Sequence, residues 1–140
     1  MNVNNYNYGV NFQAKFLNTE SLSDVVKYAM EKGKFDKLNT ARKNIDKADI
    51  RTRLEMKICY TNDKPTVIFR KYEPENKKFA IDLNDYKPTN QVEYICDNPK
   101  TDPRKFALKL IMKMSNSAPQ NNLYKEVVRK RNPKSINYLY

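Results

Sequence analysis

The clearest structural signal in this chain is a regular alternation of side chains over residues 52–60. Alternation with a period of two is typical of a strand that buries one face. One side of the predicted strand has Thr52, Leu54, Met56, Ile58 and Tyr60, and the other has Arg53, Glu55, Lys57 and Cys59. The residues Asn62-Asp63-Lys64-Pro65 then favour chain reversal, and a second apolar run begins at Val67. Residues 51–72 therefore predict a β-hairpin, so the fold must contain antiparallel strands.

Three other segments predict strands. Residues 8–17 alternate, with the side chain of Phe16 on the apolar side and that of Lys15 on the polar side. Short apolar runs predict two more strands, one at 79–83 after a loop and one at 92–96 after a turn at Pro88. With the hairpin, the chain is expected to form about five strands.

Apolar residues at helical spacing predict four helices. The first is expected to begin after an N-cap at Ser21 and to end at Gly33, which suits the left-handed position that follows a helix. The second has an apolar stripe within residues 35–48, with Arg42 among the cations elsewhere on its surface. The last two are expected over Pro103–Ser115 and Asn122–Arg131, and the Asp102-Pro103 pair predicts the start of the former, since Asp is a favoured cap and Pro a favoured first residue of a helix.

The predicted order is β-α-α-β-β-β-β-α-α. Sequential strands joined as hairpins predict the α+β class, with an antiparallel sheet of about five strands and helices packed on one face. A chain of 140 residues fits one domain. We expect a flexible N-terminus at 1–7, a single α+β domain at 8–131 and a C-terminal tail at 132–140.

Positive charge is concentrated at the C-terminal end of the chain. Residues 100–140 contain ten Lys or Arg and two acids, a net +8 out of +11 for the whole protein. A surface of one sign attracts a polyanion or an acidic protein face. Lys105, Lys109 and Lys113 recur every four residues, so they are predicted to line one side of a helix.

A second basic cluster follows in the last predicted helix. It consists of Arg129, Lys130 and Arg131, with Lys134 shortly after it. Tyrosines interleaved with cations in the tail could stack on bases while lysines neutralise phosphate. The sequence therefore predicts a basic, non-catalytic protein that binds DNA or RNA mainly through phosphates, without strong sequence readout.

Most enzymatic chemistry has no support in the residue inventory. Histidine is absent, and Gly9 and Gly33 are the only glycines, so ordinary Ser-His or Cys-His catalysis, His-ligated metals and Gly-rich phosphate loops are excluded. Asp46 and Asp49 lie one helical turn apart and are interpreted as a solvated helix face. Cys59 and Cys96 are interpreted chiefly as buried thiols, with a cross-strand disulfide as the alternative. We expect no metal and no cofactor.

One catalytic class stays open as a third hypothesis. The predicted order β-α-α-β-β-β with a helical end is similar to the RelE/ParE toxin fold. That resemblance implies ribonuclease chemistry performed by Arg, Lys and Tyr. The residues to consider on the sheet would be Arg51, Arg53 and Arg70, with Tyr60 or Tyr72. The alternative role for these residues is a solvent-facing sheet surface.

The second hypothesis is an interaction protein. Abundant Lys, Asn and Tyr suggest an AT-rich coding sequence, such as that of a phage or a mobile element. Such a protein could be an inhibitor of a host defence or nucleic-acid enzyme, as anti-CRISPR proteins are, or a virion or assembly component. Its anchors would be tyrosines near the two ends of the chain.

No signal peptide or membrane span is predicted, so we expect a cytoplasmic protein with no membrane partner. The sequence leaves the oligomeric state open.

Overall fold

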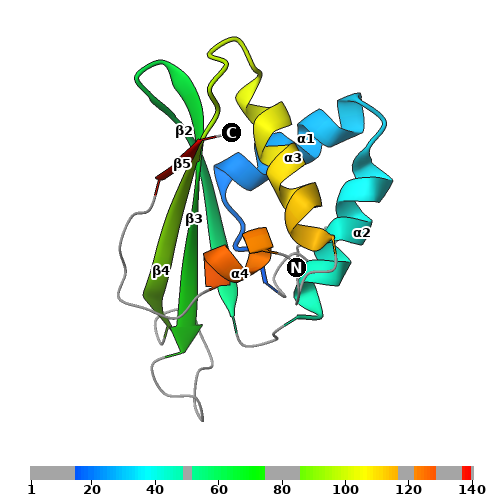
Figure 1. Ribbon diagram of the computed structural model, residues 1–140. Helices are drawn as coiled ribbons and strands as arrows, with labels where there is room; N and C mark the ends of the chain where they lie inside the picture. The colour runs from blue at the N-terminus through cyan, green and yellow to red at the C-terminus, as the bar shows by residue number, and fades with distance from the viewer. Residues whose placement is uncertain (1–14, 49–51, 75–85, 117–121, 129–136, 140) are drawn as a thin grey trace.

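A computed structural model describes residues 15–48, 52–74, 86–116, 122–128 and 137–139 (Figure 1). Its class is α+β, as predicted, with three antiparallel strands and four helices in the described part. The elements in chain order are α1 (Glu20–Glu31), α2 (Phe35–Asp46), β2 (Arg53–Thr61), β3 (Lys64–Pro74), β4 (Tyr86–Ile95), α3 (Pro103–Ser115), α4 (Asn122–Val128) and β5 (Asn137–Leu139).

The sheet has the order β2-β3-β4-β5, and the helices pack on one of its faces (Figure 1). β2, β3 and β4 are antiparallel, whereas β5 pairs parallel with β4 at Glu93–Ile95. Asn137–Leu139 lie in the segment that was predicted to be a tail, so their pairing with β4 was not expected. The predicted strand at 79–83 lies outside the described residues. Of the predicted strand at 8–17, the described part contributes Phe16, which forms an isolated parallel bridge with Leu54.

The predicted hairpin is present. Its register runs from Arg53 opposite Tyr72 to Thr61 opposite Lys64. Asn62 and Asp63 form the turn with φ angles of 50° and 65°, the left-handed pair that matches the twist of two-residue hairpins. Tyr60 lies opposite Pro65, close to the turn, and is 61% exposed.

The predicted turn at Pro88 is wrong, because Pro88 lies within β4, opposite Tyr72. The register shifts between Lys71 and Tyr72, which pair with Asn90 and Pro88, so Thr89 is an extra residue in a bulge. A bulge is one of the few places where a strand accepts proline, since proline cannot donate a ladder hydrogen bond.

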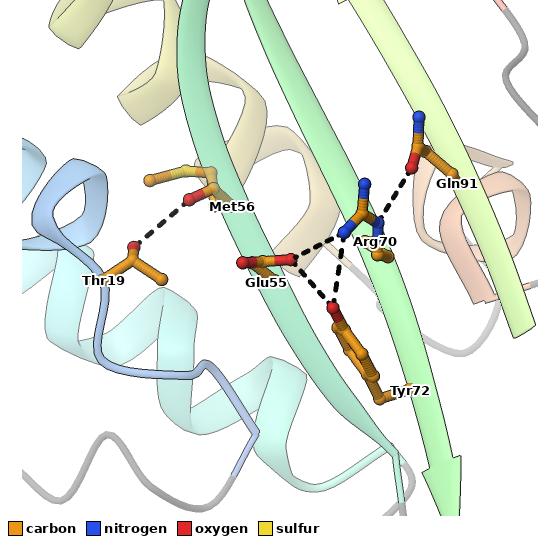
Figure 2. Close-up of polar contacts among 6 residues, drawn as sticks. All are labelled: Thr19, Glu55, Met56, Arg70, Tyr72 and Gln91. Carbon is orange, nitrogen blue, oxygen red and sulfur yellow. Dashed lines mark hydrogen bonds and ion pairs between the residues drawn. The ribbon is translucent and has the colours of Figure 1, made fainter. Parts of the chain in front are cut away.

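Helix α1 begins two residues earlier than predicted, because Thr19 and not Ser21 is its N-cap. The hydroxyl of Thr19 accepts from the Leu22 N–H at 3.1 Å. It also donates to the Met56 carbonyl at 3.2 Å, as Figure 2 shows. The Ser21 hydroxyl instead accepts from the Ile58 N–H at 2.9 Å. These bonds occupy backbone groups on the outer edge of β2, which would otherwise be open to another strand.

Gly33 ends α1 as predicted, with φ of 69°. The Gly33 N–H donates to the Met30 carbonyl and the Lys34 N–H to the Ala29 carbonyl, which is the Schellman arrangement. This stop lets α2 begin two residues later and pack beside α1.

Two cations that sequence analysis placed on polar surfaces are buried. Arg42, on α2, is 2% exposed, and Lys15 is fully buried. Burial lowers the pKa of Arg42 to about 10, against the opposing attraction of Asp46 one turn away. Arg42 and Lys15 are thus both covered on the side of their segment that the sequence pattern predicted to be solvated.

Candidate nucleic-acid interface

Helix α3 presents a narrow row of lysines to solvent. Of its thirteen residues, the exposed ones are Lys105, Lys109 and Lys113, and every other residue is buried or half-buried. We call these three residues the lysine stripe. Their spacing of four residues corresponds to about 6 Å along the helix axis. Neither Lys105 nor Lys109 forms an ion pair within the described ranges, so the charge of these two ammonium groups is not offset by a carboxylate there.

The stripe lies on a helix that is embedded in the fold. The predicted apolar face of α3, with Phe106, Leu110 and Met114, is buried, and so is Leu108 on another side. α3 packs against α1, α2, α4 and the sheet. Lysine side chains on a surface neutralise phosphates of a nucleic acid. The stripe is therefore suited to contact with phosphates.

The N-terminal end of α3 is fixed by a charged cluster. Asp102 is the N-cap, and its carboxylate accepts from the Arg104 N–H at 2.9 Å and from the Arg104 guanidinium at 2.8 Å and 3.2 Å. The same guanidinium lies 4.9 Å from the centre of the Tyr28 ring on α1 and 3.9 Å from Glu31. The hydrogen bonds from Arg104 lower the pKa of Asp102. This cluster joins α3 to α1 and sets the orientation of the stripe.

The second predicted cluster, Arg129, Lys130, Arg131 and Lys134, lies outside the described residues. The helix that precedes it is described, and the sheet holds its C-terminal end. The fully buried Asn90 side chain donates to the carbonyls of Glu126 and Val127, at 2.9 Å each. Lys71, 4% exposed and opposite Asn90 in the sheet, donates to the Val128 carbonyl.

These contacts neutralise the carbonyl end of α4, where a cation and amide donors are favourable. Asn90 and Lys71 are thus polar residues on the buried face of the sheet, and their role depends on a helix that lies far away in the sequence. The next residue after Val128 is Arg129, and the chain meets β4 again at Asn137, opposite Glu93. Both chain segments that flank residues 129–136 are thus held against β4.

Arg70, one of the arginines of the third hypothesis, lies on the sheet face that the helices leave uncovered. Arg70 donates to Gln91 at 2.8 Å and lies 3.6 Å from Glu55, while the Tyr72 hydroxyl donates to Glu55 at 3.1 Å (Figure 2). A hydrogen bond with Tyr72 raises the pKa of Arg70. We call Glu55, Arg70, Tyr72 and Gln91 the sheet-face network.

The other residues of that hypothesis are placed differently. The Arg53 guanidinium lies 5.6 Å from the centre of the Tyr86 ring. Tyr60 is near the opposite end of the sheet, opposite Pro65, and Arg51 lies outside the described residues. In the sheet-face network a carboxylate already offsets the charge of Arg70. A phosphate in the same place would have to displace Glu55 or be repelled by it.

Asp46 is half-buried and not part of the solvated face that was expected; burial raises its pKa, against the attraction of Arg42, Lys15 and Arg53. Asp49 lies outside the described residues.

Cys96 is buried and Cys59 half-buried, and both are free thiols. Within the described ranges no three His, Cys, Asp or Glu residues lie close enough together to hold a metal ion.

Comparison of the chain with protein-family models, curated proteins and solved structures finds no match. In the part of the chain that the structure describes, no helix has the length and apolar character needed to cross a membrane.

Proposed function

We propose that this protein binds nucleic acid through its phosphates, with the lysine stripe as the described part of the contact surface. The observation that carries the proposal is that the exposed residues of the embedded helix α3 are three lysines in a row. The net +8 of residues 100–140 supports it, since each phosphate contact releases counterions and the field of a basic region attracts polyanions. No catalytic step is part of the proposal.

The test is fluorescence anisotropy of labelled single-stranded DNA, duplex DNA and RNA between about 50 and 200 mM salt. The variant Lys105→Gln/Lys109→Gln/Lys113→Gln removes the stripe. If all three lysines contact phosphates, the slope of log affinity against log salt should flatten by about 2 for single strands, since each contact contributes roughly 0.7. Affinity should fall for all sequences alike.

The matched control is Lys27→Gln/Lys57→Gln/Lys100→Gln, which removes the same charge from three exposed lysines on α1, on β2 and in the turn before α3. It should change the slope far less than the stripe variant. Equal slopes for the two variants would mean that only net charge matters, which would contradict a dedicated stripe.

Two outcomes would favour the other hypotheses. Absence of binding even at low salt would indicate that the basic surface binds an acidic protein partner, as expected of an inhibitor or assembly component. Shortening of the RNA during the titration would favour the toxin-like ribonuclease, and the charge reversals Arg53→Glu and Arg70→Glu would then be the variants to test.

A further inference from the structure

A shallow hollow of about 350 Å³ lies between α2 and α3. Ala41 and Met112 supply its apolar part, and Thr40 and Asn44 supply a hydroxyl and an amide from α2. Asp36 and Lys37 also line it. The volume is at the lower end of the range for small-ligand sites.

The hollow opens beside the lysine stripe. Met112 immediately precedes Lys113 and lies three residues after Lys109, so its half-buried side chain occupies the same part of the helix surface. On the other side of the hollow, α2 contributes the exposed Lys37. Lys37 and the carboxylate of Asp36 thus line the α2 side of the hollow, and Lys109 and Lys113 lie on the helix that forms its other side.

The lining suits a base better than a phosphate. Asp36 would repel an anion held inside the hollow, whereas a carboxylate, an amide and a hydroxyl can all bond to base edges. A methionine sulfur makes favourable contacts with aromatic rings, and bases present such a ring when they are not paired. Phosphates on either side of that base would meet Lys109, Lys113 and Lys37.

We propose that this hollow takes one unpaired nucleobase from a single strand whose phosphates lie on the lysine stripe. This inference rests on the proposed function and makes it more specific, because it requires single-stranded DNA or RNA over a duplex. Asn44 is the group that bonds to the base edge, and Met112 is the surface against which the ring lies.

The experiment compares a labelled single-stranded deoxyadenylate dodecamer with a dodecamer of the same charge in which every base is absent. The wild-type protein should bind the base-containing strand about 3- to 10-fold more tightly, the range expected for one ring contact of this kind. Asn44→Ala, on an exposed helix position, and Met112→Ala should each reduce that preference and leave the salt slope unchanged. The stripe variant should instead flatten the slope for both strands.

The outcomes separate the two proposals. Equal affinity of the wild-type protein for the two strands, with a steep salt slope, would overturn the base site and leave phosphate binding intact. A base preference that persists in Asn44→Ala/Met112→Ala would also overturn it, since the bases would then be bound elsewhere. Absence of salt-dependent binding to either strand would remove the proposed function, and the base site with it.

Discussion

Asp102 has two roles that depend on the same carboxylate. It caps α3 by accepting from the Arg104 N–H, and it holds the Arg104 guanidinium over the Tyr28 ring. Sequence analysis predicted the cap from the Asp-Pro pair, because capping is a local property. The contact with Tyr28 could not be predicted, since it needs the packing of α1 on α3.

The pH dependence of stability should report on this carboxylate. The pKa of Asp102 is lower in the folded protein than the value of 3.8 in the unfolded chain. The contribution of the charged carboxylate to the free energy of unfolding is therefore complete above the unfolded pKa, and it is lost as the pH falls through the folded pKa. Asp102→Asn keeps an acceptor for the cap but cannot be charged. At pH 7 it should lower the free energy of unfolding by a few tenths to about 1 kcal/mol, because the pair is partly exposed.

Urea unfolding at pH 7, 4 and 3 would measure this difference. It should shrink between pH 4 and pH 3 as the wild-type carboxylate becomes protonated. A difference that stays constant over this range would show that the charge of Asp102 is not what stabilises the helix end.

Arg42 and Lys15 show where residue-level reasoning from sequence failed. Arg42 lies on the polar side of the α2 pattern and Lys15 on the polar side of a predicted strand, and both are buried. A periodicity separates one face from the other, but it carries no information about a second layer that covers the polar face.

At the scale of elements, local patterns predicted α3, the β2–β3 hairpin and the Gly33 stop, because each depends on residues close together in the chain. β5 was missed, since a three-residue strand has no periodicity of its own and pairs with β4 more than forty residues earlier. The roles of Lys71 and Asn90 were missed for a related reason. Their partners are carbonyls of α4, and backbone groups leave no mark in a sequence pattern.

The anchoring of α4 by Asn90 gives a sharp prediction for stability. Asn90→Ala removes two buried hydrogen bonds to the end of α4 and should lower the free energy of unfolding by about 2–3 kcal/mol. Asn90→Asp should cost more, because a carboxylate would face carbonyl oxygens at the negative end of a helix.

The control is Gln91→Ala at the next position, on the half-exposed outer face of the sheet. It should cost less than about 1 kcal/mol, since its bond to Arg70 is partly exposed to water. If urea unfolding showed that Asn90→Ala and Gln91→Ala lower the free energy of unfolding equally, the hydrogen bonds from Asn90 would not be what holds α4 on the sheet.

At the scale of the whole molecule, the helical side and the uncovered sheet face differ in how their cations are compensated. On the sheet face, Arg70 lies in a network with Glu55, Tyr72 and Gln91 (Figure 2). On the helical side, Lys105 and Lys109 have no carboxylate partner among the described residues, and the α2–α3 hollow opens beside them. The sequence patterns ranked the lysines first and the sheet arginines third, but they could not show that Arg70 pairs with Glu55, because pairing across strands is set by register.

This difference determines where a polyanion should bind. Compensated arginines gain little from a phosphate, since they would exchange one anionic partner for another, whereas lysines without a carboxylate partner replace only water and mobile ions. We therefore expect a polyanion to bind on the helical side.

The most direct test of that placement is an NMR titration of ¹⁵N-labelled protein with the single-stranded dodecamer at about 50 mM salt. The account predicts that the largest amide shift changes fall in α3 around Lys105–Lys113 and on α2 around Lys37–Asn44, with little change at Arg70 and Gln91. Largest changes on the β2–β4 face around Arg70 would contradict it, and would place the site on the sheet instead.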